Sequence, residues 1–60
     1  MKKVTALYTQ EVITFVETGQ MLPQYVTDEW ISNQAYSQIV MGDYEGKPHG
    51  DPEITNIEDE

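Results

Sequence analysis

The segment around residue 51 is the part of this sequence best suited to metal binding. His49, Asp51 and Glu53 supply one imidazole and two carboxylates at alternate positions, and an extended backbone would turn all three to one side. The pattern lacks the paired histidines of a helical zinc site and the twelve-residue loop of a calcium-binding EF-hand. We therefore favour a solvated acidic loop, and we predict neither a metal nor a cofactor.

Side chains for nucleophilic catalysis are equally scarce. The sequence has no cysteine, and its one histidine, His49, lies between Pro48 and Gly50, where no regular element would hold a base. Ser32 and Ser37 fall in a predicted helix, and nothing in the sequence pairs either hydroxyl with His49 as an activated nucleophile requires. We predict that the protein is not an enzyme.

The acidic residues are concentrated towards the C-terminus. Seven of the eleven lie in the last eighteen positions, where Lys47 is the only lysine, and the whole chain has a net charge of −8. This charge opposes direct binding to nucleic acid or to anionic lipid, because either encounter would begin with like-charge repulsion. The expected partner is therefore a larger protein with a basic surface, with no direct nucleic-acid or membrane binding.

Size and cysteine content limit the architecture and the compartment. A chain of 60 residues forms a single domain, and domains of this size bury only roughly 60% of the surface that the unfolded chain exposes. The absence of cysteine favours a reducing compartment, and no apolar run approaches the ~20 residues that a membrane-spanning helix needs. We expect a cytoplasmic protein.

Residues 4–18 are rich in β-branched and aromatic side chains, which favours two strands. In the second strand, alternation places Ile13 and Phe15 on the face opposite Val12 and Val16, so both faces are partly apolar. A helical stripe through residues 4–16 is the alternative. After a turn at Gly19, residues 20–26 would form either a third strand or a loop.

A helix is expected over residues 28–41. Thr27 is a suitable N-cap, and the two acids that follow it, Asp28 and Glu29, would face the positive end of the helix dipole. Apolar residues recur every four positions at Ile31, Ala35 and Ile39, which predicts one buried stripe.

These elements predict an α+β fold, in which a two- or three-stranded antiparallel sheet packs on one helix; an all-α helical hairpin is the alternative. The folded body is placed at residues 1–44 and a flexible acidic tail, containing Gly and Pro, at residues 45–60. Residues 53–60 are expected either to be disordered or to add a strand to the edge of the body or of a partner. The predicted core comprises Val4, Ala6, Leu7, Val12, Phe15, Val16, Ile31, Ala35 and Ile39.

Charge, size and the lack of catalytic groups favour an inhibitor or adaptor that occupies a basic surface of a larger protein, one that normally holds nucleic acid being the leading example. In size and acidity the chain resembles the small host-takeover and anti-defence proteins of phages, which would place it in the cytoplasm of a bacterial host. The alternative is a structural or assembly protein that forms a homo-oligomer, such as a homodimer paired through sheet edges, or docks into a larger particle. The predicted partner-binding residues are Asp28, Glu29, Trp30, Asp43, Tyr44 and Glu45.

Overall fold

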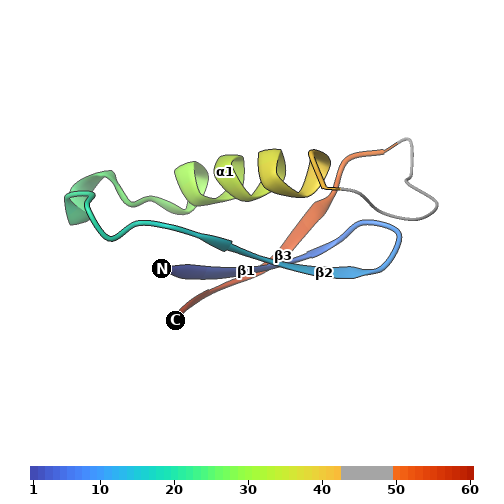
Figure 1. The fold of residues 1–60 in the computed structure, drawn as a ribbon, viewed down its shortest axis with the longest axis horizontal. Helices are drawn as coiled ribbons and strands as arrows, with labels where there is room; N and C mark the ends of the chain where they lie inside the picture. Colours follow the sequence, from blue (N-terminus) through green and yellow to red (C-terminus); the bar gives the residue numbers. More distant parts are fainter. Residues whose placement is uncertain (43–49) are drawn as a thin grey trace.

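Within the described residues, the fold consists of one antiparallel sheet, one α-helix and a short 3₁₀ helix (Figure 1). The computed structural model describes residues 1–42 and 50–60. Its elements are strand β1 (Lys2–Leu7), strand β2 (Glu11–Val16), the 3₁₀ helix η1 (Pro23–Tyr25), helix α1 (Asp28–Val40) and strand β3 (Glu53–Asp59). The predicted α+β class is confirmed, and the all-helical alternative is wrong.

β1 is the central strand, and the order across the sheet is β2-β1-β3. β1 and β2 form a hairpin that pairs Lys2 with Val16 and Leu7 with Glu11, and its turn is closed by a bond from the Tyr8 N–H to the Gln10 carbonyl (3.0 Å). Residues 20–26 do not return as a strand. Pro23, which cannot donate to a ladder, instead begins η1.

The third strand comes from the segment that was expected to be a flexible tail. Residues 53–59 pair antiparallel with β1 along the edge that β2 leaves free, which is the alternative expected for residues 53–60, a strand added to the edge of the body; the flexible tail expected at 45–60 does not extend through this stretch. Ile54 and Ile57 explain the docking, because both pack against the buried core. Residues 45–49 of the expected tail lie outside the described residues.

A β-bulge in β3 allows both isoleucines to contact the core. Val4 lies opposite Ile57 and Ala6 opposite Ile54, so two steps along β1 correspond to three steps along β3. The extra residue is Thr55, whose hydroxyl donates to the Thr5 carbonyl (3.1 Å). In a regular strand, residues three apart point to opposite faces; the bulge lets both isoleucines face the helix.

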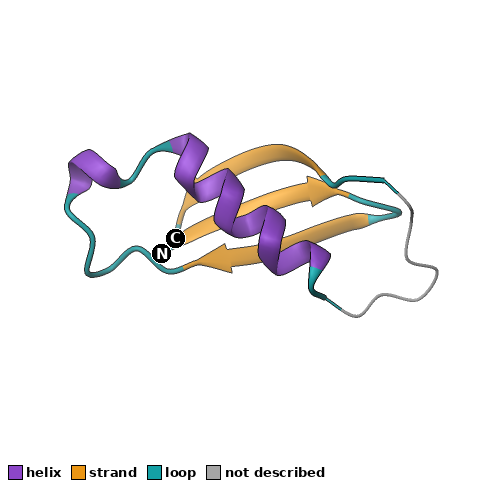
Figure 2. Cartoon of the chain, turned by 90° about the horizontal axis from the view of Figure 1, so that it is seen from above, coloured by secondary structure: helices purple, strands orange, loops and turns teal. Residues whose placement is uncertain are grey.

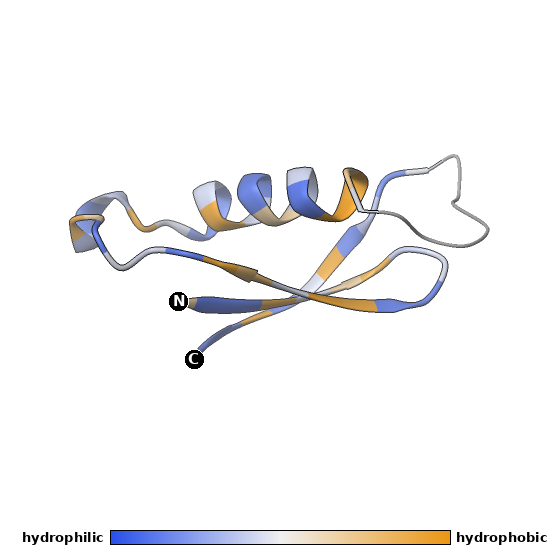
Figure 3. Cartoon of the chain, in the orientation of Figure 1, coloured by the Kyte–Doolittle hydropathy of each residue, from blue (hydrophilic) through white to orange (hydrophobic). Residues whose placement is uncertain are grey.

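α1 crosses one face of the sheet diagonally, from β3 at its N-terminus towards β2 at its C-terminus (Figure 2). Its N-cap is Thr27, whose Oγ1 accepts from the Trp30 N–H (3.1 Å), as predicted. The hydrophilic side of the helix is turned away from the sheet (Figure 3). Two clusters of buried residues fill the space between the layers: Val4, Val16, Ile31 and Ala35 in one, and Ala6, Val12 and Ile39 in the other.

Two members of the predicted core are not buried. Leu7 is 50% exposed and Phe15 is 46% exposed. Both lie at positions that alternate with the buried residues of their strands, so they project from the face that α1 does not cover. One helix covers one face of a sheet, and the apolar residues on the other face stay in contact with water.

Candidate protein-binding surface

The acidic side chains lie at the surface and are almost entirely unneutralised. All nine Asp and Glu residues within 1–42 and 50–60 are exposed, against two lysines in the same ranges. Those residues form a single ion pair, between the Lys2 Nζ and the Asp59 carboxylate. The surface is therefore strongly anionic and has little internal compensation.

Most of these carboxylates gather at one end of the sheet. β2 and β3 end there and α1 begins there, beside both termini of the chain (Figures 1 and 2). The Glu60 N–H donates to the Met1 carbonyl (3.1 Å), which holds the C-terminal residue against the start of β1. We call this region the acidic end; its acidic residues are Glu17, Asp28, Glu29, Glu58, Asp59 and Glu60.

The ion pair at the acidic end perturbs one carboxyl group. Lys2 and Asp59 lie directly opposite each other in the β1–β3 register. The hydrogen bond from the Lys2 ammonium, together with its positive charge, lowers the pKa of the Asp59 carboxyl. Asp59 is therefore ionised over a wider pH range in the folded chain than in the unfolded chain.

The predicted partner-binding residues divide into two sets. Asp28 and Glu29 are exposed in the first turn of α1, as a contact role requires. Trp30 is partly buried and packs against the core, so one part of the indole is structural and the rest reaches the surface. The other three predicted residues, Asp43, Tyr44 and Glu45, lie outside the described residues.

An apolar surface that was not predicted occupies the sheet face opposite α1, which we call the open face. Its largest apolar side chains are Leu7, Ile13 and Phe15, each close to half exposed. The signal for it was present in the sequence, because both faces of the second strand are apolar. Alternation alone does not say which of the two faces the helix covers.

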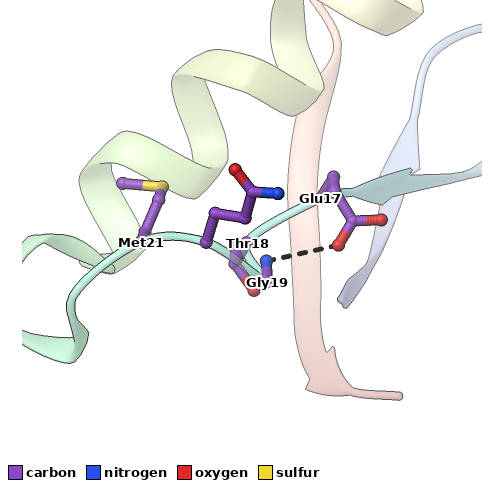
Figure 4. Close-up of a pocket in the computed structure, with 5 residues that line it drawn as sticks. Glu17, Thr18, Gly19 and Met21 are labelled. Carbon is purple, nitrogen blue, oxygen red and sulfur yellow. Dashed lines mark hydrogen bonds between the residues drawn. The ribbon is translucent and has the colours of Figure 1, made fainter.

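Two shallow depressions adjoin the acidic end. One, of about 400 Å³, lies between Asp28 and Ser32 of α1 and residues 54–57 of β3. The other, of about 450 Å³, is formed by residues 17–21, where the Gly19 N–H donates to Glu17 Oε1 at 3.2 Å (Figure 4).

The side chains that could bind a metal or act in catalysis either are not brought together or lie outside the described residues. No group of three His, Cys, Asp or Glu side chains with metal-binding geometry occurs within 1–42 and 50–60, and His49 is not among those residues. Asp51 instead accepts a hydrogen bond from the Tyr36 hydroxyl (2.5 Å). This bond, with a smaller contribution from burial, raises the pKa of Tyr36 and ties the start of the β3 segment to α1.

Comparison with protein-family models, with curated proteins and with solved structures found no match. No helix within the described ranges is long and apolar enough to cross a membrane. The functional argument therefore rests on the surface itself.

Proposed function

We propose that this protein is a small acidic inhibitor or adaptor that occupies a basic surface of a larger protein. The observation that carries the proposal is the near absence of charge compensation: nine exposed carboxylates and one ion pair across residues 1–42 and 50–60. A partner surface rich in lysine and arginine would supply the missing positive charge. Such complementarity speeds the encounter and selects the partner.

The placement of the acids on regular structure favours specific recognition over a diffuse polyanion. Glu58 and Asp59 are held by the pairing of β3 with β1, and Asp28 and Glu29 belong to the capped first turn of α1. Carboxylates on ordered backbone lose less conformational freedom on binding than those of a flexible tail. A protein site that normally holds nucleic-acid phosphates is a suitable counterpart, consistent with a host-takeover or anti-defence role in a bacterial cytoplasm.

A packing-driven assembly protein is the second candidate, and the open face is the observation that favours it. Leu7, Ile13 and Phe15 leave apolar area in water that a permanent neighbour would bury. The two candidates predict opposite responses to salt. Raising the ionic strength screens exposed charges and weakens an electrostatic complex, whereas an apolar interface is largely maintained.

Partner capture with charge variants tests the proposal. Immobilised full-length protein would be exposed to nuclease-treated lysate of the native host, and captured proteins identified by mass spectrometry at low and moderate salt. Deleting residues 45–60 is unsuitable as a control because it removes β3. The informative variant is Glu29→Gln/Glu58→Gln/Glu60→Gln, which removes three of the six side-chain charges of the acidic end and leaves the Lys2–Asp59 pair intact.

Leu7→Gln, on the open face, is the matched variant for the alternative. An inhibitor of a basic site should lose about tenfold or more in affinity on neutralisation at about 0.1 M salt, and should retain its partner with Leu7→Gln. An assembly protein should behave in the opposite way. Capture that is insensitive both to salt and to the triple neutralisation would contradict the electrostatic proposal.

A further inference from the structure

The two edges of the sheet differ in how they are protected against pairing with another chain. β3 is interrupted by the bulge at Thr55 and has acids at Glu53, Glu58 and Asp59, all features that discourage strand addition. β2 pairs with β1 without a register shift and has no proline or charged residue between Val12 and Val16. No strand within 1–42 and 50–60 covers its outer side. β2 is the unprotected edge.

The side chains along β2 define what would pair with it. Ile13 (48% exposed) and Phe15 (46% exposed) lie side by side on the open face. An exposed acid stands at each end of this apolar pair, Glu11 at the start of the strand and Glu17 directly after it. Neither acid forms an ion pair within the described ranges. The edge thus presents the pattern acid, apolar, apolar, acid at alternate positions.

We propose that the outer edge of β2 binds an extended segment of the partner protein by strand addition. The segment has a lysine or arginine near each end and apolar side chains between them. Its backbone completes the hydrogen-bond ladder of β2, its apolar side chains cover Ile13 and Phe15, and its cations meet Glu11 and Glu17. This inference rests on the proposed function: it adds the β2 edge to the acidic end as a second contact surface and names the class of partner segment that this edge takes.

The spacing of the acids sets the spacing of the cations. Glu11 and Glu17 are six residues apart, which corresponds to about 20 Å along an extended chain. A paired strand advances by the same rise per residue, so its basic side chains must also be six positions apart. Side chains at alternate positions share a face, so the two apolar residues occupy the second and fourth positions after the first cation.

A second copy of this chain is a poorer occupant of the same edge. Two β2 strands related by a two-fold axis at Thr14 would place Ile13 against Phe15 of the other copy, but they would also place Glu11 against Glu17 at both ends of the pair. Each copy has a net charge of −8. Like charges directly opposite each other destabilise a strand pair, whereas a basic segment turns the same two acids into favourable contacts.

A synthetic peptide provides the direct test. The probe is an end-blocked, fluorescently labelled seven-residue peptide with lysine at both ends, isoleucine and valine at its third and fifth positions, and threonine between. One comparison peptide replaces both lysines by glutamate. Another has two consecutive N-methylated amides at its centre. Successive amides of a strand point to opposite sides, so one of the two methyl groups interrupts the hydrogen-bond ladder whichever side of the peptide faces β2. Anisotropy titration of the full-length protein should give affinities about tenfold or more lower for each comparison peptide.

Two protein variants separate the edge from the face. Ile13→Lys places a charge on the β2 edge, whereas Leu7→Gln changes an apolar side chain of almost the same exposure on the central strand, 50% against 48%, without placing a cation opposite Glu11. The first should weaken peptide binding about tenfold or more, and the second should change it little. Circular dichroism of both variants checks that they are folded. In the wild type, saturating peptide should slow hydrogen exchange at those β2 amides that point away from β1.

Each result that contradicts the expectation leads to a different conclusion. Absence of saturable binding, equal weakening by Leu7→Gln, or unchanged exchange along β2 would overturn strand addition. Sedimentation of the full-length protein as a dimer that Ile13→Lys dissociates would assign the edge to a second copy instead. Capture of a basic partner that survives Ile13→Lys would overturn this inference and leave the proposed function standing. Peptide binding without any salt-sensitive partner in lysate would overturn the proposed function alone.

Discussion

Within the β1–β2 hairpin, the face covered by the helix and the open face have similar apolar content, yet only the covered face is part of the core. Val4, Val12 and Val16 are buried under α1, whereas Ile13 and Phe15, alternating with them, are close to half exposed. Hydrophobicity alone does not separate the two sets. What separates them is which face receives the buried stripe of the helix. The covered face stabilises the fold, and the apolar side chains of the open face remain exposed, which is why we propose that part of this face binds a partner.

The most severe test of this division compares two isoleucines. Ile31→Ala removes a side chain that is 1% exposed at the centre of the core, and should lower the free energy of unfolding by about 2–5 kcal/mol. Ile13→Ala, on the open face, should cost less than about 1 kcal/mol, because its side chain is already half in water. Urea denaturation followed by circular dichroism measures both.

A domain of this size has a stability of only about 3–9 kcal/mol, so Ile31→Ala risks unfolding outright. Ile31→Val provides the graded version, with an expected loss of about 0.5–1.5 kcal/mol. If Ile13→Ala destabilised the protein as much as Ile31→Ala, the open face would be part of the folding core and its proposed role in binding would be wrong.

The elements of the covered face could largely be predicted from the sequence. The cap at Thr27, the acids after it and the four-residue spacing of the apolar stripe predicted a helix at 28–41, and α1 is Asp28–Val40. The hairpin strands followed from β-branched residues in alternation. These signals are local, and each is repeated several times within its own segment.

The third strand was predicted only as one of the alternatives for residues 53–60, because the evidence for its docking is not local. Ile54 and Ile57 are three residues apart, so a regular strand would place them on opposite faces, and both pack against the core only through the bulge at Thr55. The identity of the free edge, and with it the candidate binding surface, depends on where β3 docks. The exposure of Leu7 and Phe15 was mispredicted for a related reason: which face of the hairpin is buried depends on where α1 packs, and the strand sequences alone do not determine this.

The bulge gives the next largest expected effect. Deleting Thr55 would restore regular alternation in β3, so that Ile54 and Ile57 could no longer both face the helix. Because these isoleucines are partly buried, loss of one from the core should cost about 1.5 kcal/mol, the lower end of the range for a fully buried side chain, measured by the same urea denaturation. Thr55→Val keeps the residue count and removes only the hydroxyl bond to Thr5, so it should cost much less. Equal losses would show that the hydroxyl bond, rather than the register, is what matters.

Substitutions at the N-cap of α1 test how much capping stabilises the helix that covers the core. Thr27→Ala leaves the Trp30 N–H without its side-chain acceptor and should lower the free energy of unfolding by about 1 kcal/mol. Thr27→Ser retains an oxygen at the same position and serves as the control. If Thr27→Ala were neutral while Thr27→Ser also left stability unchanged, helix capping would contribute nothing to holding α1 over the sheet.

The smallest expected effect contrasts two neighbouring lysines on opposite faces of β1. Lys2 lies opposite Asp59 and forms the ion pair, whereas Lys3 lies opposite Glu58, whose Oε1 accepts from the side-chain amide of Asn56. Because the Lys2 ammonium lowers the pKa of Asp59, Lys2→Gln should raise that pKa towards its ordinary value, and Lys3→Gln should move it much less. Carboxyl NMR titration measures both shifts.

The lowered pKa of Asp59 also sets how stability depends on pH. Folding favours the ionised carboxyl, so the contribution of the ion pair to stability is present above the unfolded-state pKa and is lost as the pH falls through the folded-state pKa. Lys2→Gln should therefore narrow the stability difference between neutral and acidic pH, and equal shifts in the two variants would mean that general lysine charge, rather than the ion pair, sets the pKa of Asp59.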